Sequence, residues 1–384
     1  MPRRDLSHAS DVVLWIFRAA LGLAEASPVW SGGDVTAFRS LLTYHRGWAL
    51  FARHGRAVAG VPASVLAESV TERQQVVRRQ LVAEADLRLI AEALDRADVP
   101  WLLVKGPVLA QLYQRRGNVR AFSDLDVLVA PTRLADALAA LSAVGGQLLS
   151  RNYHLMRQEL PGEVAVVGRH GTVVDLHWSL VNRSAKRSRT RIPTSRLLAA
   201  ATRRDLGGPV VPVLSEEEAL VHVCLHAALA GATRLVWLLD VALSTDNDRL
   251  NWERVVDTAR DWGVGLAVGL VLMRSNMLLG APVPASVVES LTRPGWRWAE
   301  TAGRATPARL AADLHGWPAH IASGALQHRT VNALALDRLR RRLLAPRRGH
   351  SFVQGDENPG STLYPAGDMS DLAAYLHAVA QQTD

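Results

Sequence analysis

The stretch from residue 101 to residue 129 constrains the fold more than any other part of this chain. It opens with the apolar run W-L-L-V, passes through Gly106 and Pro107 into V-L-A-Q-L-Y, and ends in S-D-L-D-V-L-V. The apolar residues after Pro107 recur at helical spacing, and proline suits the first helical position, where its missing N–H has no partner to lose. The stretch therefore predicts a strand, a turn, a helix, a loop and a second strand.

The turn at Lys105 and Gly106 is typical of a phosphate site. Glycine lets a ligand approach the backbone, and the N–H groups at the start of the next helix attract negative charge. Among the 44 lysines and arginines of the sequence, only Lys105 and Lys186 are lysines. A compact ammonium suits a phosphate oxygen, so the position of one of these rare lysines supports the prediction.

Two carboxylates, Asp124 and Asp126, lie two residues apart on the second predicted strand. Successive side chains of a strand point to opposite faces, so both carboxylates share one face, with their Cα atoms about 6–7 Å apart. Carboxylates at that spacing can share divalent ions, and two ions can hold the attacking and leaving oxygens of a phosphoryl transfer. The alternative is a pair of solvated aspartates at a strand end, because short motifs often arise by chance.

A later run, residues 172–178, predicts another strand with Asp175 and His177 on one face. A carboxylate among apolar strand residues needs a partner, because burial of an unpaired charge is costly. A metal ion shared with Asp124 and Asp126 would be such a partner. The alternative is a salt bridge between Asp175 and an arginine. His177 is expected to assist an acceptor, to orient Asp175, or to be a neutral hydrogen-bonding residue.

Other patterns complete the coarse prediction of the secondary structure. Asp34 is expected to cap a helix over residues 35–53. Residues 147–160 are expected to form a strand, followed by a turn at Pro161 and Gly162 and a partner strand over residues 164–167.

Two further candidate site residues, His226 and Asp240, lie on predicted helices in the second half of the chain. His222 and His226 lie at i and i+4, but the glutamate of a zinc-binding H-E-x-x-H is missing, so an acceptor-cleft or structural role is favoured for His226. Arg234, Trp237 and Asp240 recur on one helical face. Asp240 is expected to pair with Arg234, with a place in the acceptor cleft as the alternative.

Composition limits the partners and the location. The net charge of +8 favours anionic ligands, whether nucleotide, nucleic acid or acidic peptide. The basic stretch 182–192 has no interleaved aromatic residues for base stacking, which disfavours nucleic acid. The single cysteine, Cys224, rules out an internal disulfide, and no apolar run reaches the length of a membrane span, so we expect a cytoplasmic protein without a membrane partner.

The motifs also carry a resemblance to a known family. The runs K-G-P-V-L-A-Q-L-Y (105–113), R-A-F-S-D-L-D-V-L-V (120–129) and V-V-D-L-H-W (173–178) resemble the uncharacterised bacterial nucleotidyltransferases of the DNA-polymerase-β-like superfamily. Those enzymes carry a glycine turn, a D-x-D strand and a third carboxylate on a later strand. The wider superfamily usually has Gly-Gly or Gly-Ser at the turn and a shorter gap before D-x-D. This chain has Lys105-Gly106 at the turn and a longer arch, residues 114–122, before D-x-D.

The resemblance implies an α+β fold in which a polymerase-β-like core with a mixed β-sheet is flanked by helical regions. We expect an N-terminal helical region (1–98), a catalytic core (99–212), a C-terminal helical domain (213–348) and a linker with a terminal helix (349–384). A chain of 384 residues is long enough to bury a substantial core in such parts.

The resemblance also implies a Mg²⁺-dependent transfer of a nucleoside monophosphate to a hydroxyl, with release of pyrophosphate. ATP is the default donor because of its abundance. Asp124, Asp126 and Asp175 would hold two Mg²⁺ ions, and the triphosphate would be bound by Lys105, Gly106, Arg120 and Ser123. The acceptor would be supported by His177, His226 and Asp240.

Members of the family commonly lie beside enzymes that mature ribosomal peptides such as lasso peptides, which implies a peptide natural product or a small molecule as acceptor. Two alternatives stay open. One is a toxin-like nucleotidyltransferase that modifies tRNA or protein, and the other is a catalytically inactive nucleotide-binding scaffold.

Overall fold

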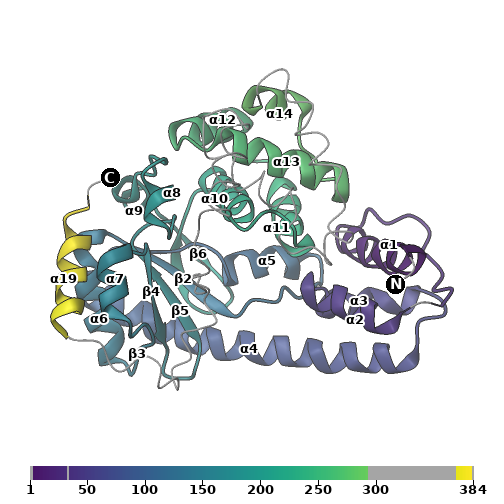
Figure 1. Cartoon of the computed structure of the whole chain (residues 1–384), viewed down its shortest axis with the longest axis horizontal. Helices are drawn as coiled ribbons and strands as arrows, with labels where there is room; N and C mark the ends of the chain where they lie inside the picture. Colours follow the sequence, from purple (N-terminus) through teal and green to yellow (C-terminus); the bar gives the residue numbers. More distant parts are fainter. Residues whose placement is uncertain (1–2, 33, 293–368, 383–384) are drawn as a thin grey trace, which may run out of the picture. The chain divides into compact units, whose positions relative to one another are not determined.

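The computed structural model describes residues 3–32, 34–292 and 369–382, which fall into two compact units (Figure 1). Unit 1 takes its described residues from Met1–Glu84, Lys105–Ser123 and Leu214–Ala325. Unit 2 takes them from Ala85–Val104, Asp124–Val213 and Leu326–Asp384. Each unit therefore gathers segments that lie far apart in the sequence.

Unit 2 is built on a mixed sheet with the strand order β3-β4-β5-β2-β1-β7-β6. β2 pairs in parallel with β5, and β1 with β7, whereas the other neighbouring strands pair antiparallel. The strands are β1 (Trp101–Leu103), β2 (Asp124–Val129), β3 (Gln147–Leu148), β4 (Glu163–Val167), β5 (Val173–His177), β6 (Thr202–Asp205) and β7 (Val210–Val213). The mixed sheet with its helices confirms the predicted α+β class and is compatible with a nucleotidyltransferase fold.

The central strands divide into an apolar face and an acidic face. Leu125 and Val127 of β2, and Val174 and Leu176 of β5, are fully buried in the core. Because side chains alternate along a strand, the acidic residues of both strands project from the opposite face of the sheet. The core thus fixes which face of the sheet carries the carboxylates.

The predicted strand over residues 147–160 is wrong. Only the short β3 forms there, and Asn152 then caps α7 (Tyr153–Glu159) by accepting a hydrogen bond from the Leu155 N–H at 3.1 Å. Tyr153 and Met156 are buried at helical spacing. The side-chain cap and this three-residue period outweigh the strand pattern, so only Gln147 and Leu148 pair with β4, which pairs along its whole length with β5 on its other edge.

Helices complete unit 2. They are η2 (Pro131–Arg133), α6 (Leu134–Ala143), α7, α8 (Ser184–Arg187), α9 (Thr194–Ala199), α19 (Met369–Ala380) and the last part of α4 (Ala63–Arg96). α19 packs against α7, α6 and η2, and it is the yellow helix at the edge of the unit in Figure 1.

A buried tyrosine fastens α19 to the rest of unit 2. Leu372, Tyr375 and Val379 form the buried face of the helix. The Tyr375 hydroxyl donates to the Pro161 carbonyl at 3.0 Å and accepts from Trp178 Nε1 at 3.1 Å. α19 is therefore tied to the turn before β4 and to the residue that follows β5.

Unit 1 is helical in its described residues. Its helices are α1 (Arg3–Ala20), α2 (Val35–Tyr44), α3 (Trp48–His54), η1 (Gly55–Ala57), the first part of α4, α5 (Pro107–Arg115), α10 (Glu216–Leu229), α11 (Leu235–Thr245), α12 (Trp252–Asp261), α13 (Gly265–Leu279) and α14 (Ala285–Leu291). Asp34 caps α2 as predicted.

The single helix expected over residues 35–53 is interrupted. Arg46 adopts a left-handed conformation with φ of 54°, which ends α2 and starts a new direction at α3. The neighbouring His45 is fully buried, and its Nδ1 accepts a hydrogen bond from the Leu235 N–H at 3.1 Å. A buried histidine bonded to α11 is thus the tertiary contact that accompanies the break.

Every helix among the described residues falls short of the length and apolar character needed to cross a membrane. The expected four-part division of the chain and its cytoplasmic location stay predictions. The expected linker over residues 349–368 and the helical pattern over residues 293–348 lie outside the described residues.

Candidate active site

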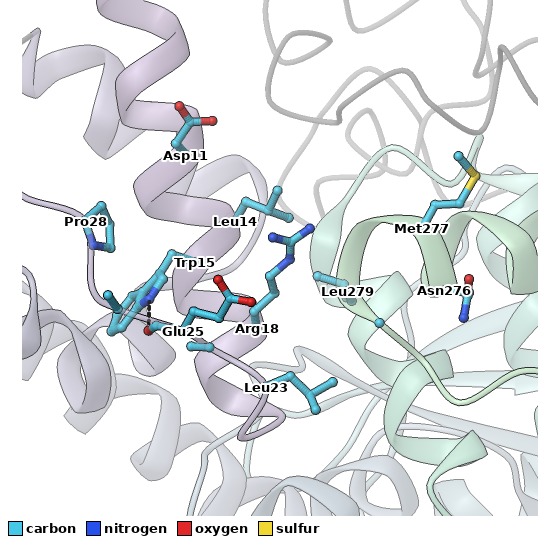
Figure 2. A pocket seen from close by; sticks show the side chains of 13 residues that line it. Asp11, Leu14, Trp15, Arg18, Leu23, Glu25, Pro28, Asn276, Met277 and Leu279 are labelled. Atoms are coloured by element: carbon cyan, nitrogen blue, oxygen red, sulfur yellow. Dashed lines mark hydrogen bonds between the residues drawn. The ribbon is translucent and has the colours of Figure 1, made fainter.

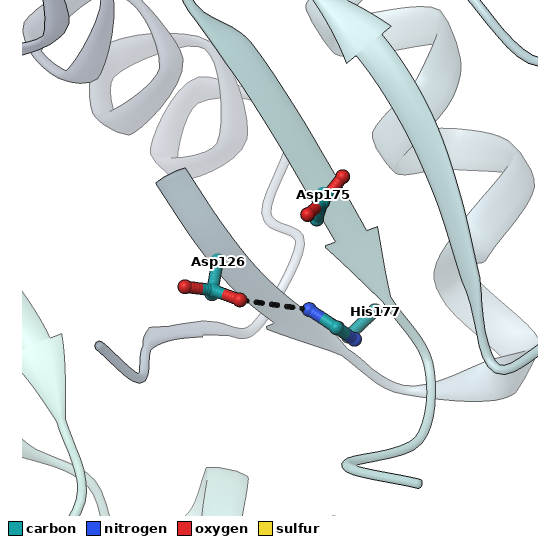
Figure 3. A group of neighbouring side chains, drawn as sticks. All are labelled: Asp126, Asp175 and His177. Atoms are coloured by element: carbon teal, nitrogen blue, oxygen red, sulfur yellow. Dashed lines mark hydrogen bonds and ion pairs between the residues drawn. The ribbon is translucent and has the colours of Figure 1, made fainter. Parts of the chain in front are cut away.

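Strand pairing brings two aspartates together on the acidic face of the sheet. Asp126 of β2 lies opposite Asp175 of β5 in the parallel register of these strands. His177 lies two residues further along β5, and all three side chains are buried. Each offers one potential ligand atom, and these atoms lie within 4.8 Å of one another (Figure 3).

His177 lies between two carboxylates. Its Nε2 is 3.2 Å from Asp126 Oδ1, and its Nδ1 is 3.2 Å from Glu163 Oε2. Glu163 is the first residue of β4 and lies opposite His177 in the antiparallel pairing of β4 with β5. The site therefore spans three adjacent strands.

Glu163 is a candidate that the sequence interpretation missed. The turn at Pro161 and Gly162 marks the start of β4, so a hairpin count that paired β4 with β5 would have placed Glu163 opposite His177. The mistaken strand over residues 147–160 hid this signal, because it is the predicted hairpin partner of β4 across the turn at Pro161 and Gly162, whereas β4 forms its hairpin with β5.

The crowding of carboxylates perturbs the titration of Asp175. Burial raises the pKa of its carboxyl to about 7, and the negative charges of Glu163, Asp126 and Asp124 act in the same direction, against the opposing influence of His177. Like charges that cannot reach water disfavour one another's ionised forms. A bound cation would relieve this repulsion.

The residues present fit a divalent cation. Asp126 and Asp175 supply carboxylate oxygens, which Mg²⁺ and Mn²⁺ prefer, and His177 supplies an imidazole nitrogen, which suits transition metals. Asp124, two residues before Asp126 on the same strand face, is half-buried and lies outside this three-residue group. It stays a candidate ligand by its position on the strand.

The predicted phosphate turn belongs to unit 1. Gly106 has φ of 47° and ψ of −108°, a conformation that only glycine adopts readily, and Pro107 is the first residue of α5. Lys105 Nζ lies 3.3 Å from His226 Nδ1. The ring of Trp237 meets the His226 ring edge-on, with their centroids 5.9 Å apart. His226 thus supports the lysine of the turn, whereas no third metal-ligating residue joins His222 and His226 in the described part of the chain.

The expected pairing of Asp240 with Arg234 is wrong. Asp240 instead binds Arg120, whose Nε lies 2.7 Å from Oδ1 and whose Nη2 lies 2.8 Å from Oδ2. The Tyr113 hydroxyl donates to the same Oδ1 at 2.9 Å. Arg234 precedes the first residue of α11 and has extended backbone angles, so helical spacing does not carry it to Asp240; its guanidinium lies over the rings of Tyr44 and Trp237.

This pairing places two predicted site residues in the interior of unit 1. The side chains of Arg120 and Asp240 are only 9% and 3% exposed. A bidentate pair of this kind holds the arch before β2 against α11. Ser123, the remaining predicted phosphate ligand, is exposed and directly precedes β2.

A cavity of about 560 Å³ opens elsewhere in unit 1 (Figure 2). Its walls include Trp15 and Arg18 of α1 and the end of α13 around Asn276. Trp15 Nε1 donates to the Glu25 carbonyl, and Arg18 Nε donates to the Leu278 carbonyl. None of the predicted site residues lines this cavity.

A mixed sheet with buried carboxylates on adjacent strands is the arrangement expected of a nucleotidyltransferase. A search with protein-family profiles matches the family described as "Uncharacterised nucleotidyltransferase" over residues 32–280. The match covers more than half of the chain, so the protein belongs to this family and is a transferase. No curated protein matches the sequence.

Proposed function

We propose that the protein uses divalent cations to transfer a nucleoside monophosphate from a nucleoside triphosphate to a hydroxyl, with release of pyrophosphate. The observation that carries this proposal is the group of Asp126, Asp175 and His177, buried together on one face of the sheet in a chain of the nucleotidyltransferase family. ATP is the default donor and AMP the default group transferred. Bound divalent cations, two Mg²⁺ ions by default, would neutralise the phosphates and favour in-line displacement.

The residues of the chain take separate tasks in this proposal. Asp126 and Asp175 hold the cations, with Asp124 as a further ligand, and Asp175 is also the candidate base for the proton of the acceptor hydroxyl. Lys105 binds a phosphate oxygen, and Gly106 lets the triphosphate approach the backbone. Most of the rate then comes from positioning and charge stabilisation rather than from covalent chemistry by the protein.

Arg120 and Asp240 receive an indirect task. Their buried bidentate pair, shared with Tyr113, fixes the arch that leads into β2. We assign Arg120 and Asp240 to support of the site and leave Ser123, at the exposed end of the arch, as a phosphate ligand.

Substitution of Asp126 tests the proposal. Purified protein is incubated with each labelled nucleoside triphosphate, Mg²⁺ or Mn²⁺ and candidate acceptors, and pyrophosphate is followed. Asp126→Ala should lower transfer at least ~10³-fold, because loss of charge stabilisation in a water-poor site raises the barrier by several kcal/mol. Glu159→Ala, on the exposed side of α7, is the matched control. Wild-type transfer by a folded Asp124→Ala/Asp126→Ala protein would refute the assignment.

The acceptor is proposed to be a peptide natural product or a small molecule. Arg187, within the basic stretch 182–192, donates to the carbonyls of Leu160, Val181 and Asn182 and lies over the Trp178 ring. This arginine therefore serves the fold of unit 2, which leaves fewer basic groups of the stretch for an RNA backbone.

Salt dependence separates this acceptor class from the tRNA alternative. An RNA that engages about six phosphates loses roughly 10³-fold in affinity between 50 and 200 mM salt, whereas an acceptor with one or two charges loses only a few-fold. Arg183, Arg189 and Arg191 are exposed, and their joint replacement by Gln should leave transfer to a small acceptor intact. Steep salt dependence of turnover that this triple change abolishes would favour the tRNA-modifying alternative. Absence of transfer with every donor and acceptor would favour the scaffold.

A further inference from the structure

We infer that His177 is a nitrogen ligand of the cation site and that Glu163 orients its ring, so that the site prefers a first-row transition ion over Mg²⁺. The inference rests on the proposed function in that it takes the buried group as the cation site. It goes further in naming the class of ion and a positioning residue for it.

The contacts of His177 indicate this role. Nε2 forms a hydrogen bond with Asp126 Oδ1 at 3.2 Å, Nδ1 lies at ion-pair distance from Glu163 Oε2, 3.2 Å, without hydrogen-bond geometry, and the imidazole is 9% exposed. A neutral imidazole carries one N–H, so it can donate to only one of two carboxylates. A cation held by Asp126 would take the lone pair of Nε2 and leave the ring proton on Nδ1, the nitrogen that faces Glu163.

Glu163 is held in place for this task by the backbone and by a neighbour. The register of β4 and β5 sets it opposite His177. Its carboxylate also accepts a hydrogen bond from Asn182 Nδ2. The backbone of Glu163 is held before and after this residue. Before it, the Pro161 carbonyl accepts hydrogen bonds from Tyr375 and Trp178, and after it the chain continues as β4.

A carboxylate that binds the far nitrogen of a metal-bound histidine recurs in metalloproteins. The partner fixes the tautomer and the ring orientation and raises the basicity of the ligating nitrogen, and its loss typically lowers metal affinity 10–100-fold. Imidazole nitrogen favours ions late in the Irving–Williams order, such as Co²⁺ and Zn²⁺, whereas Mg²⁺ favours oxygen and water. Glu163 is therefore a positioning residue that adjusts the selectivity of the site.

Direct measurement of metal binding tests the inference without nucleotide or acceptor. The full chain is freed of metal by chelation, and Co²⁺ and Mg²⁺ are titrated separately by calorimetry, with the visible absorption of Co²⁺ as a ligand-sensitive signature. The wild-type protein should bind Co²⁺ at least ~10-fold more tightly than Mg²⁺. Circular dichroism of each metal-free variant confirms that it is folded.

Three variants test three roles: His177→Asn tests the nitrogen ligand, Glu163→Gln tests the orienting carboxylate, and Glu159→Gln tests the loss of a carboxylate away from the site. Glu163→Gln should lower Co²⁺ affinity about 10–100-fold and lower Mg²⁺ affinity less. His177→Asn, which offers an oxygen in place of nitrogen, should remove the preference for Co²⁺ and change its absorption spectrum. Glu159→Gln removes a carboxylate from the exposed side of α7 and should leave both affinities unchanged.

Two results would overturn the inference. One is an unchanged ratio of Co²⁺ to Mg²⁺ affinity in folded Glu163→Gln and His177→Asn proteins, and the other is a wild-type protein that does not bind Co²⁺. A Co²⁺ preference in a protein that transfers no nucleotide would leave the inference standing and refute the proposed function. Transfer by a protein without the preference would refute the inference alone.

Discussion

Asp126 and Asp175 lie opposite each other on two parallel strands, so the separation of their backbones is set by the β2–β5 hydrogen-bond ladder. Neither residue is on a loop, and the apolar neighbours of both strands are fully buried on the other face. Groups carried by rigid, packed elements keep their geometry better than groups on loops. The candidate cation ligands are therefore held in place before any ion or substrate binds.

Lys105 is expected to act on the triphosphate. A charge-assisted hydrogen bond contributes about 1.5–3 kcal/mol, so Lys105→Met should lower kcat/KM for the nucleotide roughly 10–100-fold. Lys186→Met is the matched control and should change kcat/KM by less than about two-fold. Steady-state kinetics with the nucleotide varied measure both. Equal effects of the two substitutions on kcat/KM would show that Lys105 does not bind the triphosphate specifically.

The Arg120–Asp240 pair should behave as a buried ion pair. Asp240→Ala leaves the Arg120 guanidinium buried without its carboxylate and should lower the free energy of unfolding by about 3–5 kcal/mol. The double change Arg120→Met/Asp240→Leu removes both charges and should restore much of that loss. Urea unfolding of the single and double variants forms a cycle that measures the coupling. A loss below about 1 kcal/mol in Asp240→Ala would contradict the buried pair.

The buried His45 should make stability depend on pH. Burial, aided by the positive charges of Arg234 and Arg274, lowers the pKa of His45 from 6.5 to about 3. Between these values the unfolded chain binds a proton that the folded chain does not, so this stabilising contribution is complete above about pH 6.5 and is lost as the pH falls toward 3. The slope from this group approaches about 1.4 kcal/mol per pH unit.

Replacement of this histidine tests the pH prediction. In His45→Gln, urea unfolding between pH 4 and pH 7 should show a shallower rise of stability with pH than in the wild-type protein. His377→Gln, on the exposed side of α19, should leave the slope unchanged. Parallel pH profiles for wild-type and His45→Gln would refute the prediction.

Tyr375 should decide whether α19 stays docked. Tyr375→Ala leaves a cavity under the helix and should lower stability by about 3–5 kcal/mol, with α19 cleaved early in limited proteolysis. Tyr375→Phe keeps the ring and loses only the hydroxyl, and Trp178 Nε1 still donates to Pro161 at 2.8 Å, so a loss of about 1 kcal/mol is expected. An alanine variant as resistant to protease as the wild-type protein would contradict the docking.

Short-range patterns predicted the parts of the site that depend on strand and helix period. The alternation in residues 124–129 and 173–177 correctly placed Asp126, Asp175 and His177 on one face, and the glycine and proline of the turn correctly located the start of α5. These features depend on residues that are close in the sequence, so the periodicity of the sequence is enough to predict them.

Features that depend on distant partners were not predictable in the same way. Asp240 binds Arg120, which is 120 residues away, and helical spacing offered Arg234 instead. Glu163 joins the site because β4 pairs with β5 as well as with β3, and the sequence pattern offered only the partner in residues 147–160. In both cases the local pattern left several partners open, and tertiary packing chose among them.

The docking of α19 also imposes an order in time. The last strand of the sheet in the described residues ends at Val213 and α19 begins at Met369, so a ribosome that adds about 5–20 residues per second needs roughly 8–30 s to make the chain between them. Small domains commonly fold within about a second. The sheet can therefore form before α19 exists, and Pro161 and Trp178 then lack their Tyr375 hydroxyl partner until the end of synthesis.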